Sequence, residues 1–397
     1  MKIASSWSTV SDTVLAIKEA YNLLVSRLES PPDFIAVYAT DTYDLDKLLS
    51  LLKQAAPNAQ IFGGTTCLGV MTEEGFHSNN GSGLGMLGIC DKSGSYGVGA
   101  SLTGDDPRAS AAAAVTEALE QSQRLGQMPG LVTMCAAPGY EELMILGIQD
   151  VIGPDVPVSG GSSADNAING QWKQFANDKV YSNALVVATI FPSMPVGYAF
   201  HSGYSPTELS GTVTRCKDRI IYEIDGRPAS HVYNDWTNGE LSDILATGGN
   251  VLAANTLRPL GKVVGQVENI PYYRLIHPIM IHPDGSITLF ATVYPGDELT
   301  LMTGTRESLV SRAGRVVQAA LESKSLAQSQ ISGVLMNYCA GCMLKVKDDM
   351  PKVVDGVSST LNGKPFLGAF TFGEQGCFLG GENCHGNLMI SVLAFGS

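Results

Sequence analysis

The chain has 397 residues, of which 44% are hydrophobic and 16% are charged, and its formal net charge is −13. This length and apolar content predict a globular protein with one large core or two to three ordinary ones. The acidic balance excludes nucleic acid and an anionic membrane surface as expected partners, because both need a basic protein surface. No apolar run approaches the length of a membrane span.

The cysteine content and the N-terminal residues indicate the cellular compartment. The eight cysteines are scattered and lack the density of a secreted disulfide scaffold. The segment after Met1 has one basic residue, Lys2, and lacks the apolar core of a signal peptide. We therefore expect a cytoplasmic protein.

The predicted elements, taken in chain order, repeat themselves. A first unit, residues 1–95, has a strand (3–6), a helix (12–28), an apolar strand (34–40), a further helical stretch, a strand ending at 63–66 and a closing strand (84–89). A second unit, residues 96–200, has the same order at 100–104, 109–121, 131–137, 160–163 and 184–190. Pro32 precedes Gly63 by 31 residues and Pro129 precedes Gly160 by 31 residues, so we infer that the units are related.

A third copy follows a segment that does not fit the repeat. Residues 201–296 are rich in Tyr, His and Pro and predict hairpins, such as 211–216 with 219–224. The third unit, residues 297–397, begins with a strand (301–304) and a helix (308–321), and continues with strands at 334–339, 368–371 and 388–395. The sequence thus predicts two domains, 1–200 and 201–397. The fold class is α/β, with mixed sheets built from three strand–helix–strand units and an inserted α+β segment.

Small polar residues follow the second strand of each unit. Strand–helix–strand units usually place their strands in parallel, so the loops after these strands gather at one edge. Hydroxyls and backbone amides in such loops can hold a carboxylate or another anion, although they equally suit tight turns. Asp165 and Glu374 suggest either acid–base catalysis or structural hydrogen bonding. The ligand-binding candidates are Thr65, Thr66, Ser162, Ser163, Asp165, Thr371 and Glu374.

A cysteine cluster in the third unit predicts a possible metal site. Cys339 and Cys342 form a C-x2-C pair, and Cys377 and Cys384-His385 follow. Thiolates at this first spacing suit zinc or an iron–sulfur cluster, provided that the two segments converge. The alternatives are cysteines that pack in a core, or a redox dithiol.

Several motifs together resemble the FIST family over essentially the whole chain. The N-terminal half resembles it at 63–66 and 160–165, and the C-terminal half at 203–207, 222–229, 277–278, 371–374 and 385–387. The resemblance implies a sensory module for a small molecule or gas, which regulates a histidine kinase or a diguanylate cyclase. Stand-alone members of this length are similar to haem proteins that sense nitric oxide.

Haem would require an axial ligand from His, Cys, Met or Tyr. His277, inside a family motif, is the first candidate and His385 the second, with Tyr273 and Arg274 as neighbours of His277. Arg274 suits a haem propionate, or else a surface carboxylate. A lone histidine is also often a structural residue.

Motifs of several enzyme classes are absent from the sequence, namely an esterase elbow, a phosphate-binding loop and a His-Glu-x-x-His helix. This absence favours a sensor, and a metal-dependent enzyme that uses the cysteine cluster is the alternative. An exposed strand edge on a repeat unit also suggests a homodimer.

Overall fold

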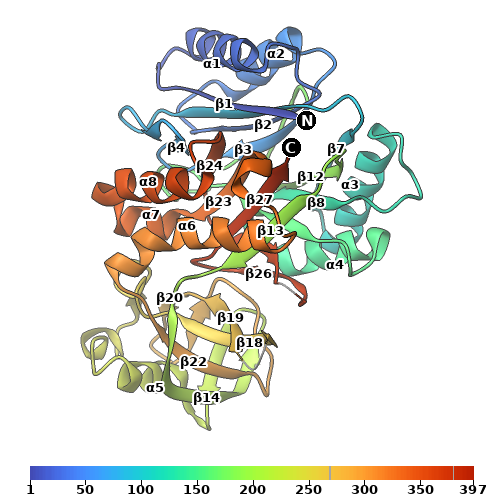
Figure 1. The fold of residues 1–397 in the computed structure, drawn as a ribbon. Helices are drawn as coiled ribbons and strands as arrows, with labels where there is room; N and C mark the ends of the chain where they lie inside the picture. Colours follow the sequence, from blue (N-terminus) through green and yellow to red (C-terminus); the bar gives the residue numbers. More distant parts are fainter. Residues whose placement is uncertain (268–269, 379) are drawn as a thin grey trace.

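The computed structural model describes residues 1–267, 270–378 and 380–397. These residues form three related units and an insert (Figure 1). In the described parts of the chain, no helix is long and apolar enough to cross a membrane.

The first two units share one order of elements: strand, helix, strand, helix, strand, hairpin, strand. The first unit consists of β1 (Lys2–Ser8), α1 (Thr13–Leu28), β2 (Phe34–Ala39), α2 (Leu45–Ala55), β3 (Gln60–Thr65), the hairpin β4 (Val70–Thr72) and β5 (Gly75–His77), and β6 (Leu84–Cys90). The second consists of β7 (Ser95–Leu102), α3 (Pro107–Gln121), β8 (Leu131–Ala136), α4 (Glu141–Ile152), β9 (Val158–Ser162), the hairpin β10 (Gln174–Ala176) and β11 (Lys179–Tyr181), and β12 (Ala184–Phe191).

The third unit is interrupted after its first strand. It consists of β13 (Val196–His201), α6 (Arg306–Glu322), a short 3-10 turn η2 (Gln328–Gln330), β23 (Ile331–Cys339), α7 (Ala340–Lys345), the 3-10 turn η3 (Lys347–Asp349), α8 (Met350–Leu361), β24 (Phe366–Thr371), the hairpin β25 (Glu374–Cys377) and β26 (Asn383–Gly386), and β27 (Ile390–Gly396). The sequence had placed the first strand of this unit at 301–304. In the structure β13 takes that position, because it pairs with β27 from Val196 to His201.

The insert therefore lies inside the third unit, between β13 and α6. It consists of β14 (Ser205–Lys217), β15 (Ile220–Ile224), β16 (Arg227–Pro228), α5 (Ala229–Trp236), the 3-10 turn η1 (Ser242–Ile244), β17 (Gly249–Asn250), β18 (Leu260–Val267), β19 (Ile270–Ile276), β20 (Pro278–Ile281), β21 (Ile287–Leu289) and β22 (Glu298–Thr303). The predicted hairpin is confirmed, since β14 pairs with β15. Residues 301–303 belong to β22, which pairs with β14 and β18 in the sheet of the insert.

The three units exchange their hairpins in a cycle. The sheet orders are β1-β6-β2-β3-β10-β11, β26-β25-β9-β8-β12-β7 and β13-β27-β23-β24-β4-β5. The hairpin of the first unit thus extends the sheet of the third, that of the third extends the sheet of the second, and that of the second extends the sheet of the first. Each sheet mixes one parallel pair with antiparallel pairs, which confirms the predicted α/β class with mixed sheets.

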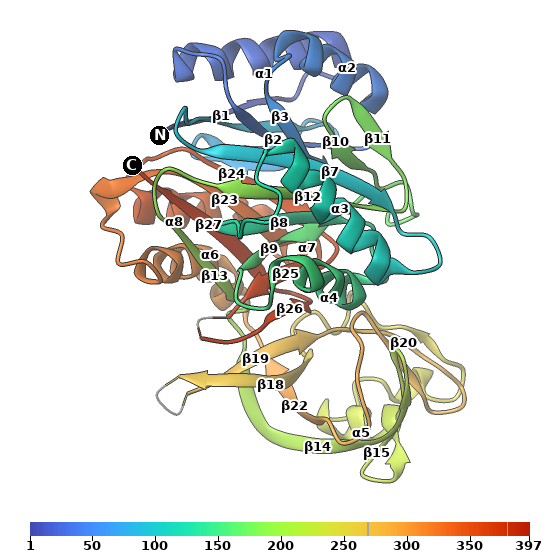
Figure 2. The ribbon, with the colours of Figure 1, turned by 90° about the vertical axis from the view of Figure 1, so that its right-hand side faces the viewer.

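The inner faces of the three sheets pack on one another and the helices cover their outer faces (Figure 2). The shared central core includes Phe34, Tyr38, Tyr96, Leu335 and Phe395. Strands that are buried on both faces read as continuous apolar runs, as β2 does. The insert has a separate core and lies at the end of the molecule opposite α1 and α2.

Local sequence fixes the start of the first helix in each unit. The side chains of Asp12, Asp106 and Thr305 each accept a hydrogen bond from the backbone amide three residues later. These N-caps satisfy an amide that the helix itself cannot, which stabilises each helix by about 1 kcal/mol. The repeat is therefore visible in the caps as well as in the strands.

Two glycines allow close approach of neighbouring strands. Gly63 of β3 lies beside Val37 of β2, and Gly160 of β9 lies beside Met134 of β8. A Cβ atom at Gly63 would lie 1.8 Å from the Val37 carbonyl oxygen, and one at Gly160 would lie 2.1 Å from the Met134 oxygen. Both positions therefore require glycine.

Candidate functional site

The ends of β3, β9 and β24 meet where the three units join. In each unit this strand runs parallel to the strand before it in the chain, and its last residue holds an equivalent position. These last residues are Thr65, Ser162 and Thr371. Backbone hydrogen bonds connect the three loops directly, for example from Ala164 N to Thr65 O at 2.9 Å and from Phe372 N to Ser162 O at 3.0 Å. The predicted convergence of these loops is thus present.

The polar side chains of these loops are buried and bonded within the protein. Thr66 Oγ1 accepts from Phe370 N at 2.8 Å, which links the first unit to the third. Gln375 Nε2 donates to Ser162 Oγ at 3.1 Å, and Gln174 Nε2 donates to Ser163 Oγ at 2.6 Å. Lys173 N donates to Thr65 Oγ1 at 2.8 Å. These hydroxyls therefore hold the units together.

The two predicted acidic residues also have internal partners. Asp165 accepts hydrogen bonds of 2.9–3.1 Å from the backbone amides of residues 167, 169, 170 and 171, which fixes the following loop. Glu374 accepts from Thr371 Oγ1 at 2.8 Å and from Met389 N at 3.0 Å. Burial raises the pKa of Glu374 well above its usual value, against the opposite effect of these two hydrogen bonds.

One cavity of about 450 Å³ lies at this strand edge, between the second unit, the third unit and the insert. We call it the His277 cavity. Its walls are mainly apolar and aromatic, as in most small-molecule sites. The lining residues are Pro138, Ile168, Trp172, Leu252, Ala253, Thr256, His277, Phe290, Cys339, Gly341, Leu344, Lys345, Thr371, Phe372, Gly373, Asn387 and Leu388.

His277 follows β19 and is 3% exposed. Burial lowers its pKa to about 4, against a smaller opposite influence of the nearby carbonyls of Leu252 and Asn255, so the imidazole is neutral at neutral pH. Its backbone amide donates to Asn387 Oδ1 at 3.2 Å, and its ring lies 6.2 Å from that of Phe290. Among the described residues, its Nε2 atom has no hydrogen-bond partner with proper geometry, although the carbonyls of Leu252 and Asn255 lie near the ring.

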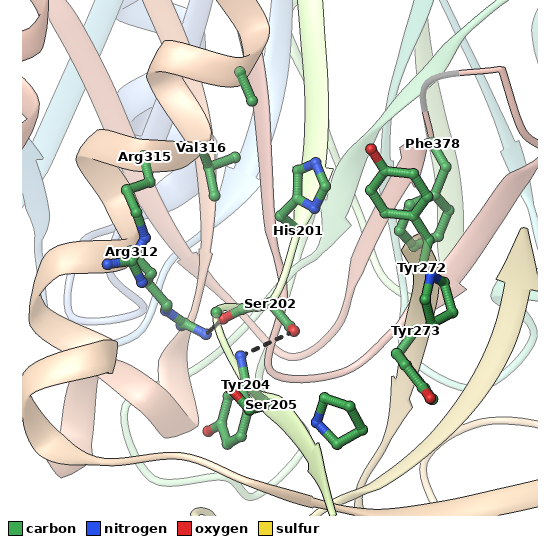
Figure 3. Close-up of a pocket in the computed structure, with 14 residues that line it drawn as sticks. His201, Ser202, Tyr204, Ser205, Tyr272, Tyr273, Arg312, Arg315, Val316 and Phe378 are labelled. Atoms are coloured by element: carbon green, nitrogen blue, oxygen red, sulfur yellow. Dashed lines mark hydrogen bonds between the residues drawn. The ribbon is translucent and has the colours of Figure 1, made fainter. Parts of the chain in front are cut away.

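The other haem candidates line different cavities. Tyr273 lines a cavity of about 480 Å³, the Tyr273 cavity, together with Tyr204, Arg312 and Phe378 (Figure 3). Arg274 and His385 line a third cavity of about 600 Å³. Adjacent residues of a strand point to opposite faces, so the side chains of Tyr273 and Arg274 lie on opposite faces of β19. The four predicted cofactor residues are thus not brought to one cavity.

The four cysteines of the predicted metal site lie on two parts of the fold. Cys339 ends β23 and Cys342 follows on α7, whereas Cys377 and Cys384 lie on the β25–β26 hairpin, which extends the sheet of the second unit. Residues 1–267, 270–378 and 380–397 contain no group of three or more His, Cys, Asp or Glu side chains placed to hold a metal ion. The expected convergence of the cysteines is therefore not found there.

A charged cluster links the second unit to the insert. Arg219 Nη2 lies 2.8 Å from Glu141 Oε2 and 2.6 Å from Glu142 Oε2, while Thr292 N donates to Glu142 Oε1 at 2.7 Å. Burial raises the pKa of both carboxyls, but the electrostatic effects of the neighbouring His385 and Arg219 outweigh it and keep both pKa values lowered. Both glutamates therefore carry charge at neutral pH.

The sequence analysis missed Arg312. It lines the Tyr273 cavity and donates a hydrogen bond to the carbonyl oxygen of Leu388, a residue that lines the His277 cavity. It lies on α6 and is fully buried, among Leu309, Ala313 and Val316. A charged residue within the apolar face of an otherwise amphipathic helix was the available signal. The aromatic walls Trp172, Phe290 and Phe372 gave no signal, because they come from three distant segments.

Comparison with known proteins identifies the family. An 88-residue stretch is 28% identical to an uncharacterized protein of Methanocaldococcus jannaschii, and it covers 22% of this chain and 17% of that protein. The crystal structure of a cyanuric acid hydrolase from A. caulinodans aligns over 100% of this chain and 99% of that one, with a TM-score of 0.40 and 9% identity. Residues 33–227 match the FIST N domain and residues 229–377 match the FIST C domain. Since these two matches together cover most of the sequence, the chain belongs to the FIST family.

Proposed function

We propose that this protein is a small-ligand sensor in signal transduction and that its ligand occupies the His277 cavity. FIST domains are small-ligand-sensing domains of signalling proteins, and the chain carries both FIST N and FIST C. The observation that carries the choice of cavity is the buried Nε2 atom of His277, which lacks a partner among the described residues. A buried polar atom left unbonded costs about 1–3 kcal/mol, so a ligand that bonds it binds with that advantage.

We propose, more specifically, that the ligand is haem, because the donor chemistry of this cavity suits it. A neutral histidine nitrogen is a common axial ligand of haem iron, and His277 supplies one among apolar walls. Lys345 lines the same cavity and is exposed, so its ammonium is available to a ligand carboxylate. When bound, haem would supply an open iron position for nitric oxide.

Ligand binding would bias the contact between the insert and the repeat units. Leu252, Ala253 and His277 come from the insert, while Cys339 and Thr371 come from the third unit, so the ligand touches both. A ligand that prefers one arrangement of these walls shifts the population toward it. The surface that changes would regulate a partner histidine kinase or diguanylate cyclase.

Absorption spectroscopy tests the haem proposal. Protein reconstituted with haem should show an intense Soret band that shifts when nitric oxide is added, and His277→Ala should lose it. His282→Ala is the matched control, because His282 bonds Thr288 Oγ1 at 2.7 Å on the β20–β21 hairpin and lines none of the three cavities described above. A spectrum that both variants leave unchanged contradicts the role of His277.

A second pair of variants tests the cavity for any apolar ligand. Leu344 lines the cavity and is 41% exposed, whereas Leu143 on α4 is 42% exposed and lies outside it. Leu344→Glu should weaken binding of haem or of an apolar fluorescent probe at least tenfold, about 1.4 kcal/mol, and Leu143→Glu should not. Equal losses in the two variants would place the binding site elsewhere.

Purified kinases and cyclases of the same organism then test the partner. Autophosphorylation or cyclic-di-GMP formation is compared between ligand-free and ligand-bound protein.

A further inference from the structure

Cys339 and Cys342 lie between the His277 cavity and the Tyr273 cavity. Cys339 lines the first cavity and is 7% exposed, and Cys342 is fully buried behind it. Tyr204, which lines the second cavity, has its hydroxyl 3.6 Å from Cys342 Sγ. The same hydroxyl lies 2.7 Å from the carbonyl oxygen of Thr256, a residue of the first cavity. The thiol pair therefore forms part of the wall that separates the two cavities.

Arg312 places a fully buried positive charge beside this pair. Its Nη1 atom donates to the backbone oxygens of Ser202 at 2.7 Å and of Leu388 at 2.6 Å, and its guanidinium carbon lies 4.7 Å from the centre of the Tyr338 ring. Within the described residues, its Nε and Nη2 atoms have no hydrogen-bond partner. A fully buried guanidinium requires a negative charge nearby, because an isolated buried charge is strongly unfavourable.

Cys342 is the group best suited to supply that charge. The ionisable groups that act most strongly on Arg312 are Cys342, Tyr338 and Tyr204, and a thiol is more acidic than a phenol. Burial raises the pKa of the nearby carboxyl of Glu374, which disfavours a charge on it. Burial opposes ionisation of Cys342, but Cys339, Arg312 and Tyr204 outweigh it and lower its pKa to about 6.

We propose that Cys339 and Cys342 form a reactive dithiol that a hydroperoxide entering the His277 cavity oxidises to a disulfide. The site uses the cavity assigned above to the ligand, but it depends neither on haem nor on His277. Cys339 offers the accessible sulfur, and the pair carries one negative charge opposite Arg312. The hydrogen bond to Cys342 and burial raise the pKa of Cys339, so the resting negative charge lies on Cys342, and Cys339 reacts after it passes its proton to Cys342.

The oxidation then proceeds in two balanced steps. Cys339 Sγ attacks the peroxide, so that an S–O bond forms and the O–O bond breaks, and the departing oxygen takes the proton held by Cys342. Cys342 Sγ next attacks the sulfenic sulfur of Cys339, so that the S–S bond forms and the S–O bond breaks, releasing hydroxide. The two sulfurs lose two electrons and the hydroperoxide gains them.

The disulfide would remove the negative charge that faces Arg312. Arg312 holds the carbonyl oxygen of Ser202, which lies between β13 and β14 at the point where the chain enters the insert. Loss of the thiolate leaves the guanidinium buried without a counter-charge and weakens this anchor. Oxidation of the dithiol thereby weakens the contact of Arg312 with the segment through which the chain enters the insert.

Peptide mapping of peroxide-treated protein tests the proposal. Fully reduced protein is exposed to hydrogen peroxide, free thiols are alkylated, and the fraction oxidised is followed at each cysteine. Cys90 and Cys216 are more exposed than Cys339 and Cys342 and serve as internal references. We expect the Cys339–Cys342 disulfide to form first, about threefold or more faster than either reference oxidises, because its higher thiolate fraction outweighs its lower nucleophilicity. Dithiothreitol should reverse it.

Variants separate this site from general thiol oxidation. Cys342→Ser should slow oxidation of Cys339 to the rate of Cys90, while Cys377→Ser, on the β25–β26 hairpin, should leave the disulfide rate unchanged. His282→Ala, a change at a residue that lines none of the three cavities, should also leave it unchanged. The assay uses protein without haem and follows cysteine oxidation instead of the Soret band, so failure of ligand binding and failure of the dithiol are told apart. Earlier oxidation of Cys90 or Cys216, or a stable sulfenic acid on Cys339 without a disulfide, would overturn the proposal. The two results that would overturn the proposal are measured in wild-type protein, so they do not require that a variant folds.

Discussion

Replacing Arg219 by methionine removes the positive charge that joins the insert to the second unit. The side chains of Glu141 and Glu142 are 2% and 19% exposed, so the variant leaves two neighbouring carboxylates buried without their partner. Breaking a buried pair by removing one member typically costs about 3–5 kcal/mol. Arg219→Met should therefore lower the free energy of unfolding by about that amount at pH 7.

The pKa of Glu142 reports on the whole charged cluster. Against the opposing effect of burial, His385 first, and then Arg219 and the Thr292 amide, lower it from 4.5 to about 2, so Arg219 supplies part of this stabilisation. Because the folded-state pKa is lowered, this stabilisation is complete above pH 4.5 and is lost as the pH falls toward 2. The gap between wild type and Arg219→Met should thus be largest at neutral pH and shrink below pH 4.5.

Urea unfolding followed by tryptophan fluorescence, at pH 7 and at several values between 5 and 3, measures both effects. Arg108→Met is the matched control, since Arg108 pairs with Asp150 through two hydrogen bonds, yet these side chains are 51% and 45% exposed. An exposed pair contributes less than about 1 kcal/mol. Equal losses in the two variants, or a loss in Arg219→Met that does not change with pH, would refute the reasoning from burial.

Three further substitutions test the architecture. Gly63→Ala should destabilise the protein by about 3 kcal/mol, because its Cβ would lie 1.8 Å from the Val37 oxygen; an unchanged midpoint of thermal unfolding would contradict the close strand contact. Gly356→Ala should stabilise the protein by about 1 kcal/mol, since it lies within α8 and its Cβ meets nothing within 4 Å; a lower midpoint would show an unrecognised contact. Asp165→Ala should cost about 1–3 kcal/mol and speed hydrogen exchange of the amides at 167, 169, 170 and 171, and unaltered exchange would disprove its bonding role.

Much of the fold was predictable because it depends on local pattern. The equal spacing from Pro32 to Gly63 and from Pro129 to Gly160 reflects the shared register of β2–β3 and β8–β9, in which Val37 lies opposite Gly63 and Met134 lies opposite Gly160. The third unit misled the sequence reading because residues 301–303 are apolar and precede a helix directly, as 100–102 do. The true first strand, β13, lies about one hundred residues earlier in the chain, where no local pattern connects it to α6.

Less of the site was predictable, because distant segments build it. His277, Cys339 and Thr371 were candidates from the sequence and do line one cavity. Thr65, Ser162 and Ser163 were chosen for the same chemistry, but hydrogen bonds across the exchanged hairpins occupy them. Those hairpins have strands of three or four residues, too short for periodicity to show which sheet they join.

The cyclic hairpin exchange also constrains the order in which the chain can mature on the ribosome. The first sheet lacks its outer two strands until residues 174–181 have been synthesised, and the second sheet waits for residues 374–386. The β4–β5 hairpin emerges early but meets its partner β24 only some three hundred residues later. The nascent chain therefore exposes unpaired strand edges during most of translation, a state prone to misassociation that a chaperone would protect.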